Sequence, residues 1–133
     1  MAYDVKLAEA FFRARTTFTT GVHELERLLD GDGDPAQGPG ESRGGYQIVD
    51  VRYPRDFANG HVPGAINLPK GKWQNPRDLR KDATLYVYCY TPTCHLAAEA
   101  AAELTAQGYK VVEVEGGWER WVQDGFAIEA KAA

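Results

Sequence analysis

The sequence has few cysteines, no long apolar segment and no excess of basic residues, and each absence excludes a class of protein. Two cysteines among 133 residues are too few for the disulfide framework of a small secreted scaffold, so we expect reduced thiols. No stretch approaches the roughly 20 apolar residues of a membrane helix, and the N-terminus lacks the apolar core of a signal peptide. We therefore expect a cytoplasmic protein with no membrane partner.

The charge also excludes nucleic acid as a partner. The formal charge of −4 arises from 19 acidic and 15 basic residues, which are mixed along the chain and form no basic stripe that would attract phosphate backbones. The length and the hydrophobic content of 44% fit one globular domain with an ordinary core.

Strand and helix patterns alternate along the chain. β-branched and aromatic segments predict strands at 16–20, 46–51, 65–68, 84–88 and 110–114. Helical spacing predicts helices at 4–15, 23–31, 54–59, 76–81, 94–107 and 116–125. This alternation indicates the α/β class, with an open parallel sheet and helices on both faces. We expect a helical extension at 1–16, packed as a cover, before a domain at 17–133.

The segment 30–45 is rich in glycine and proline and has almost no apolar residue, which predicts a flexible loop. Four acidic residues in it have the spacing of ligands 1, 3, 5 and 12 of a calcium loop: Asp30, Asp32, Asp34 and Glu41. Pro35 replaces the glycine that such a loop needs, and a strand follows instead of a helix. We therefore favour a solvated loop and predict no metal site.

Cys89 directly follows the most apolar predicted strand. Ligand sites of parallel sheets form beyond the carboxyl ends of strands, where loops enter helix N-termini. Unpaired N–H groups there favour a thiolate, so we expect the pKa of Cys89 below the ordinary value of about 8.5. A free cysteine is also a common core residue, but the polar loop that follows favours exposure. The candidate site loop comprises Tyr90, Thr91, Pro92, Thr93, Cys94 and His95.

Two motifs resemble those of a known family. "DVRYPRDFANGHVPGAINLP" at 50–69 and "GGWERW" at 116–121 are similar to the signatures of the rhodanese-like sulfurtransferases, and Cys89 matches the catalytic position. The resemblance covers residues 17–128. It implies a rhodanese-like fold and an enzyme, with no cofactor, that moves a sulfane sulfur from a donor such as thiosulfate or a persulfide through a Cys89 persulfide. The implied acceptors are a thiol, cyanide or a protein sulfur carrier.

The loop departs from the common family pattern and resembles a subgroup with Cys-x-x-Pro-x-Cys. Pro92 has no N–H, so the loop loses one donor. No arginine or lysine lies in the loop to attract a dianionic donor, and His95 is the nearest candidate cation, to which we give a minor role.

Cys94 has two interpretations. As a resolving thiol it would attack the Cys89 persulfide, expel sulfide and leave a disulfide, because five residues across a loop can bring two Cα atoms within about 7 Å. Alternatively, it is a small residue that packs the first helical turn beneath the loop. We favour packing, since a thiol facing the core does not reach the outer sulfur.

Three residues of the first motif are predicted to be structural. Asp50 and Arg52 follow a strand end, where we expect an internal ion pair or hydrogen-bonded clamp between loops. His61 is expected to hold the turn into the strand at 65–68.

Other functions remain as alternatives. A phosphatase or arsenate reductase needs an arginine six residues after the nucleophile, and His95 occupies that position without the bidentate fork that binds a tetrahedral oxyanion. A non-catalytic interaction module would not need Cys89. A dithiol redox protein that uses Cys89 and Cys94 stays open.

Overall fold

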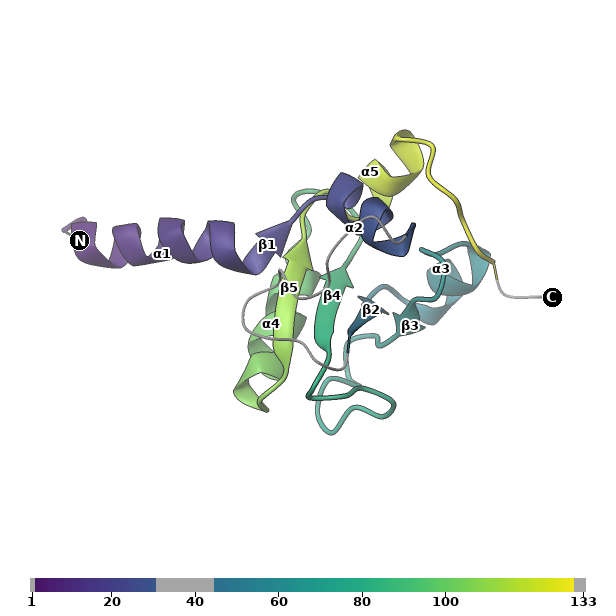
Figure 1. Ribbon diagram of the computed structural model, residues 1–133. Coiled ribbons are helices and arrows are strands. Elements are labelled where there is room, and N and C mark those ends of the chain that lie inside the picture. The colour runs from purple at the N-terminus through teal and green to yellow at the C-terminus, as the bar shows by residue number, and fades with distance from the viewer. Residues whose placement is uncertain (1, 31–44, 131–133) are drawn as a thin grey trace.

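The computed structural model describes residues 2–30 and 45–130 and contains a five-stranded parallel sheet (Figure 1). The strand order is β1-β5-β4-β2-β3. The strands are β1 (Thr19–Thr20), β2 (Tyr46–Asp50), β3 (Ile66–Asn67), β4 (Thr84–Tyr88) and β5 (Lys110–Val114). The central position of β4, which is buried along its whole length, follows from its continuous apolar and aromatic sequence.

Helices occupy both faces of this sheet, as the alternating pattern predicts. They are α1 (Val5–Phe18), α2 (Val22–Leu29), α3 (Pro54–Asn59), α4 (Leu96–Ala106) and α5 (Gly117–Gln123). The small residues Ala97 and Ala100, with Leu104, pack α4 against one face. On the other face, Leu25 of α2 and Trp121 of α5 belong to a second core cluster. The α/β class with a parallel sheet covered on both faces is confirmed.

The alternation of side chains along β4 connects the two cores to the site. Leu85 and Val87 face the cluster of α4, whereas Tyr86 and Tyr88 face the cluster of α2 and α5. This is the period-two pattern of a strand. Cys89, the next residue, continues the first series and therefore lies on the α4 side.

The helix predicted at 76–81 is wrong. Asn75 and Asp78 have positive φ angles of 52° and 66°, a left-handed conformation that a helix does not accommodate. The amide of Gln47 on β2 donates to the carbonyl of Asp78 and accepts from the Arg80 N–H, at 2.8 and 2.9 Å. The Gln47 side chain thus forms hydrogen bonds with backbone groups of Asp78 and Arg80 that a helix would use for its own hydrogen bonds.

The strand predicted at 16–20 is correct only in its last two residues. Helix α1 continues to Phe18, and the Thr16 and Thr17 hydroxyls donate back to the carbonyl of Arg13. Only Thr19 and Thr20 pair with β5. β-branched composition alone did not distinguish the end of a helix from a strand.

The N-terminal helix does not cover the domain. No residue of α1 is buried, and Leu7 and Phe11 are 68% and 58% exposed. Figure 1 shows the helix extending away from the sheet. Its attachments are the strand pairing that follows it and an ion pair between Arg15 and Glu115 at 3.1 Å.

The loop at 30–45 and its calcium-like spacing fall almost wholly outside the described residues, which omit 31–44. Among the described residues, no helix is long and apolar enough to cross a membrane.

We predict that Leu104→Ala destabilises the domain by about 2–5 kcal/mol, because a fully buried leucine leaves a cavity against β4 and β5. Urea unfolding monitored by circular dichroism measures the change. Leu7→Ala is the matched control, since the same truncation at a largely exposed position is expected to stay within about 0.5 kcal/mol of the parent. Equal losses for the two variants would show that the core is not packed as described.

Candidate active site

Cys89 lies at the carboxyl end of β4, as the sequence predicts, but it is not exposed. The residue is 3% accessible and contacts the core cluster of α4. The polar residues after it do form a surface loop: Pro92 and Thr93 are exposed, while Thr91 is half-buried. The expectation of exposure therefore holds for the loop and is wrong for Cys89, whose side chain still follows the inward alternation of β4.

A tight turn brings Cys94 back towards Cys89. The Cys94 N–H donates to the carbonyl of Thr91 at 3.2 Å, a four-residue β-turn with Pro92 at its second position, where proline is favoured. Helix α4 begins only at Leu96. Cys94 thus lies on the turn before the helix, half-buried and packed against the edge of the α4 core cluster. This position is compatible with both interpretations of Cys94.

His95 provides no charge to the loop interior. It is the N-cap residue of α4, it is exposed, and its side chain makes no capping hydrogen bond. Its position after the turn explains this, because the chain there already runs along the outer surface.

The start of α5 fixes the orientation of the loop backbone. The N–H groups of Trp118 and Glu119 donate to the carbonyls of Cys89 and Tyr90, both at 2.8 Å. Within a planar trans peptide the carbonyl and the N–H point in opposite directions. With the two carbonyls held by α5, the N–H groups of Tyr90 and Thr91 are directed away from α5, to the side of the two thiols.

Gly117 makes this close approach possible. Its φ is +60°, and a Cβ placed on it would lie 2.8 Å from the carbonyl oxygen of Cys89 and 3.1 Å from the Thr91 nitrogen. The left-handed conformation and the absence of a side chain are both needed at this position. The glycine pair of the "GGWERW" motif therefore has a physical role in positioning the loop.

The thiol of Cys89 is protonated at rest. Burial, with a smaller contribution from the interaction with the Cys94 side chain, raises the pKa of Cys89 to about 12, although the N–H groups of Ala97 and Tyr90 act in the opposite direction. The thiol donates to the carbonyl of Cys94 at 3.5 Å. The predicted N–H groups do point at the sulfur, but the expected lowering of the pKa is wrong, because desolvation outweighs them.

Cys94 ionises before Cys89. Partial burial opposes its ionisation, but the Cys89 side chain and the N–H groups of Tyr90, Leu96 and Thr91 together lower the pKa of Cys94 below its ordinary value. These donors favour the charged form, as N–H groups around an anion do. When the pair has lost one proton, the negative charge therefore resides on Cys94, the less buried of the two residues.

Tyr90 links the loop to α3. Its hydroxyl donates to a carboxylate oxygen of Asp56 at 2.5 Å and accepts from the N–H of Tyr53 at 3.0 Å. Burial and the bond to Asp56 raise the pKa of Tyr90 to about 12, so that it remains a donor. Neither partner follows from the sequence, since the side-chain contact joins residues 34 positions apart.

Asp50 and Arg52 form the predicted internal ion pair. Both are buried, and the guanidinium donates to both carboxylate oxygens, with Nη2 at 2.8 Å from Oδ2. Nη2 also donates to the carbonyl of Gly60, and the hydroxyl of Tyr88 donates to Asp50. The Arg52 guanidinium lies 4.4 Å from the ring centroid of Trp118. The pair thus joins β2, β4, the end of α3 and α5 beneath the loop.

A pocket of about 240 Å³ lies beside the loop. Its lining residues come from α3, α5 and the loop: Arg52, Asp56, Asn59, Gly60, Tyr90 and Trp118. Neither cysteine lines it, because the Cys89 side chain faces α4 on the other side of the sheet. The pocket adjoins the loop backbone and not the sulfur atoms.

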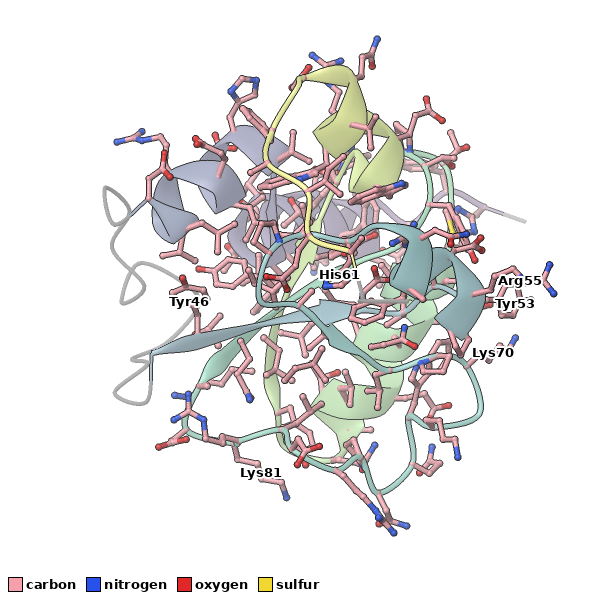
Figure 2. All side chains as sticks on the ribbon, turned by 90° about the vertical axis from the view of Figure 1, so that its right-hand side faces the viewer. Tyr46, Tyr53, Arg55, His61, Lys70 and Lys81 are labelled. Carbon is pink, nitrogen blue, oxygen red and sulfur yellow. The ribbon has the colours of Figure 1, made fainter. Side chains whose placement is uncertain are left out.

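The His61 side chain contacts the end of α3 and the C-terminal segment. Its Nδ1 donates to the carbonyl of Phe57 at 2.8 Å, its Nε2 lies 3.2 Å from Glu129 Oε1, and its ring stacks on the Phe57 ring. Figure 2 shows His61 enclosed within the molecule, whereas Tyr53 and Arg55 point outward from the region of α3. The ring contacts Phe57 and Glu129 and neither cysteine, so we assign His61 to the scaffold.

The comparisons with known proteins agree with this geometry. The model of the rhodanese-like domain matches residues 37–124, more than half of the chain. The chain belongs to the rhodanese-like domain family. The matched segment contains the ion pair, both cysteines and the start of α5.

Relatives and solved structures support the same assignment. The chain is 34% identical to the uncharacterised YqhL protein of Bacillus subtilis over 96 residues, or 68% of this chain and 72% of that protein. It is 37% identical to the thiosulfate sulfurtransferase GlpE of Stutzerimonas stutzeri over 91 residues, or 65% and 80% of the two chains. The crystal structure of BH2092 from Bacillus halodurans superimposes with a TM-score of 0.74 at 25% identity, covering 96% of this chain and 87% of that one.

We predict that Gly117→Ala displaces the loop and changes the rate at which iodoacetamide alkylates the cysteines, because the new Cβ collides with the Cys89 carbonyl. Gly125→Ala is the matched control. Its φ is also positive, at +75°, but no atom lies within 4 Å of the added carbon. The control is expected to lose only the left-handed strain of about 1–2 kcal/mol and to keep the parent alkylation rate. Identical alkylation rates in all three proteins would contradict the close approach.

Proposed function

We propose that this domain is a sulfurtransferase that carries a sulfane sulfur on Cys89. The observation that carries the proposal is the position of Cys89 at the end of β4, on the side to which the hydrogen bonds from α5 turn the N–H groups of Tyr90 and Thr91. Such donors stabilise a persulfide anion as an oxyanion hole stabilises oxygen. The family membership and the GlpE relatives support a sulfur compound as the substrate.

The first step needs a route for the Cys89 proton, because this thiol is protonated at rest. The Cys94 side chain interacts directly with it and is the group that ionises first. We propose that Cys94 accepts the proton as Cys89 attacks the outer sulfur of thiosulfate. The bond between the two donor sulfurs breaks, sulfite leaves with the electron pair, and Cys89 holds the sulfur as a persulfide anion. This is nucleophilic catalysis with an activating base.

The second step transfers the outer sulfur to an acceptor. A thiolate or cyanide attacks the terminal sulfur of the persulfide, and Cys89 leaves as a thiolate that recovers its proton from Cys94. Neither step requires a metal or an organic cofactor. The loop has no arginine or lysine, so we expect low affinity for a dianionic donor and propose that small persulfides are better donors than thiosulfate.

The phosphatase alternative has less support. Such chemistry needs a fork of donors on a tetrahedral oxyanion, and His95 stands at the corresponding position, exposed and outside the loop interior.

We predict that Cys89→Ser abolishes sulfur uptake. The parent protein is incubated with thiosulfate or a low-molecular-weight persulfide in the absence of reductant. It is expected to release sulfite from thiosulfate and to change in mass because of the transferred sulfur, whereas Cys89→Ser gives neither result. Sulfite release and intact-protein mass spectrometry under non-reducing conditions measure both. Thermal unfolding of the variant confirms that it folds. Uptake at the parent rate in Cys89→Ser, or no uptake by the parent from any of these donors, would contradict the proposal.

A further inference from the structure

The turn at residues 91–94 places a second thiol beside the sulfur carrier. The bond from the Cys94 N–H to the Thr91 carbonyl closes the turn, and Pro92 fixes one of its backbone angles. The Cys89 thiol donates to the main-chain carbonyl of Cys94 at 3.5 Å, so the turn holds the two residues next to each other. A thiol in this position has direct access to the Cys89 sulfur and does not need to reach the outer atom of a persulfide.

The surroundings of Cys94 are those of an attacking thiolate. The N–H groups of Tyr90, Thr91 and Leu96 act on its sulfur, and the residue is half-buried while Cys89 is enclosed. In thiol–disulfide exchange the thiolate attacks, and the sulfur atom it reaches decides the product. A residue that only filled space at the edge of the core would not need these donors.

We propose that Cys94 resolves the Cys89 persulfide by attacking the inner sulfur, so that the domain releases hydrosulfide and forms a Cys89–Cys94 disulfide. This inference rests on the proposed function and adds to it a reductive activity on sulfane sulfur. The bond between the Cys94 and Cys89 sulfurs forms, and the bond between Cys89 and the outer sulfur breaks. The outer sulfur leaves with the electron pair.

A single proton serves both steps. It moves from Cys89 to Cys94 during the attack on the donor, and then from Cys94 to the outer sulfur, which leaves as hydrosulfide. With thiosulfate, the Cys94 thiolate, the Cys89 thiol and thiosulfate become a disulfide, hydrosulfide and sulfite, and the total charge does not change. The two cysteines are oxidised and the sulfane sulfur is reduced. Each further turnover needs an external dithiol that reduces the disulfide.

The N–H groups around the two sulfurs have a role in both reaction steps. Before sulfur uptake it stabilises the charge on Cys94, and afterwards it stabilises the charge on the persulfide that occupies the same loop. The absence of a basic side chain from the loop also favours the departure of an anionic product.

The test compares the reduced parent protein with Cys94→Ser after incubation with thiosulfate or glutathione persulfide and no other thiol. We expect the parent to release one equivalent of hydrosulfide per chain, to lose both free thiols and to lose the mass of two hydrogens. We expect Cys94→Ser, which lacks the proton acceptor of the first step, to take up sulfur more slowly than the parent, to release no hydrosulfide and, at completion, to retain the mass of one added sulfur. Cys94→Ala repeats the test without a hydroxyl, and Cys89→Ser is the control for release without a carrier.

The outcomes separate this inference from the proposed function. A parent protein that retains one added sulfur with a free Cys94 thiol, as Cys94→Ser does, would overturn the resolving role and leave the sulfurtransferase intact. Absence of sulfur uptake in both the parent and Cys94→Ser would overturn the proposed function, and the resolving role with it. Hydrosulfide release from Cys94→Ser at the parent rate would also contradict the inference.

Discussion

The site depends on two hydrogen bonds from the first turn of α5 to the loop after β4. The N–H groups of Trp118 and Glu119 hold the carbonyls of Cys89 and Tyr90, and the planarity of the peptide then directs the next two N–H groups to the opposite side. Gly117 allows the two backbones to approach closely enough for these bonds. The direction of the N–H groups in this loop is thus set by α5, a helix that follows β5 and not β4.

This constraint explains why the two thiols differ. Both lie on one loop, yet Cys89 continues the inward alternation of β4 and loses its hydration, while Cys94 lies on a turn and receives the N–H groups that the loop directs inward. Desolvation has the larger effect on the pKa of Cys89, whereas the hydrogen bonds together have the larger effect on the pKa of Cys94. The buried pair of Asp50 and Arg52 supports this arrangement, because it joins the ends of β2 and β4 to α3 and contacts the Trp118 ring.

The sequence predicts the sheet well because the strands can be recognised from their own local residue patterns. The continuous apolar run of β4 and the β-branched residues of β5 lead to the observed parallel order, and the strand-end position of Asp50 and Arg52 leads to their ion pair. Errors arise where distant residues decide. Gln47 captures the backbone at 78–80 and prevents a helix there. The burial of Cys89 and the contact of Tyr90 with Asp56 depend on how the loop closes against α4 and α3, which no local pattern encodes.

The most direct test of the central claim is a pH titration of the thiolate ultraviolet absorbance of the reduced protein, with Cys94→Ser for assignment. A thiol whose pKa is lowered gains its charge at a lower pH than an ordinary thiol, and one whose pKa is raised gains it later. The account therefore predicts one thiolate that appears at a lower pH than an ordinary thiol and is missing in Cys94→Ser, and a second that appears only as the pH approaches about 12. Two thiols that titrate together within the ordinary range would contradict it.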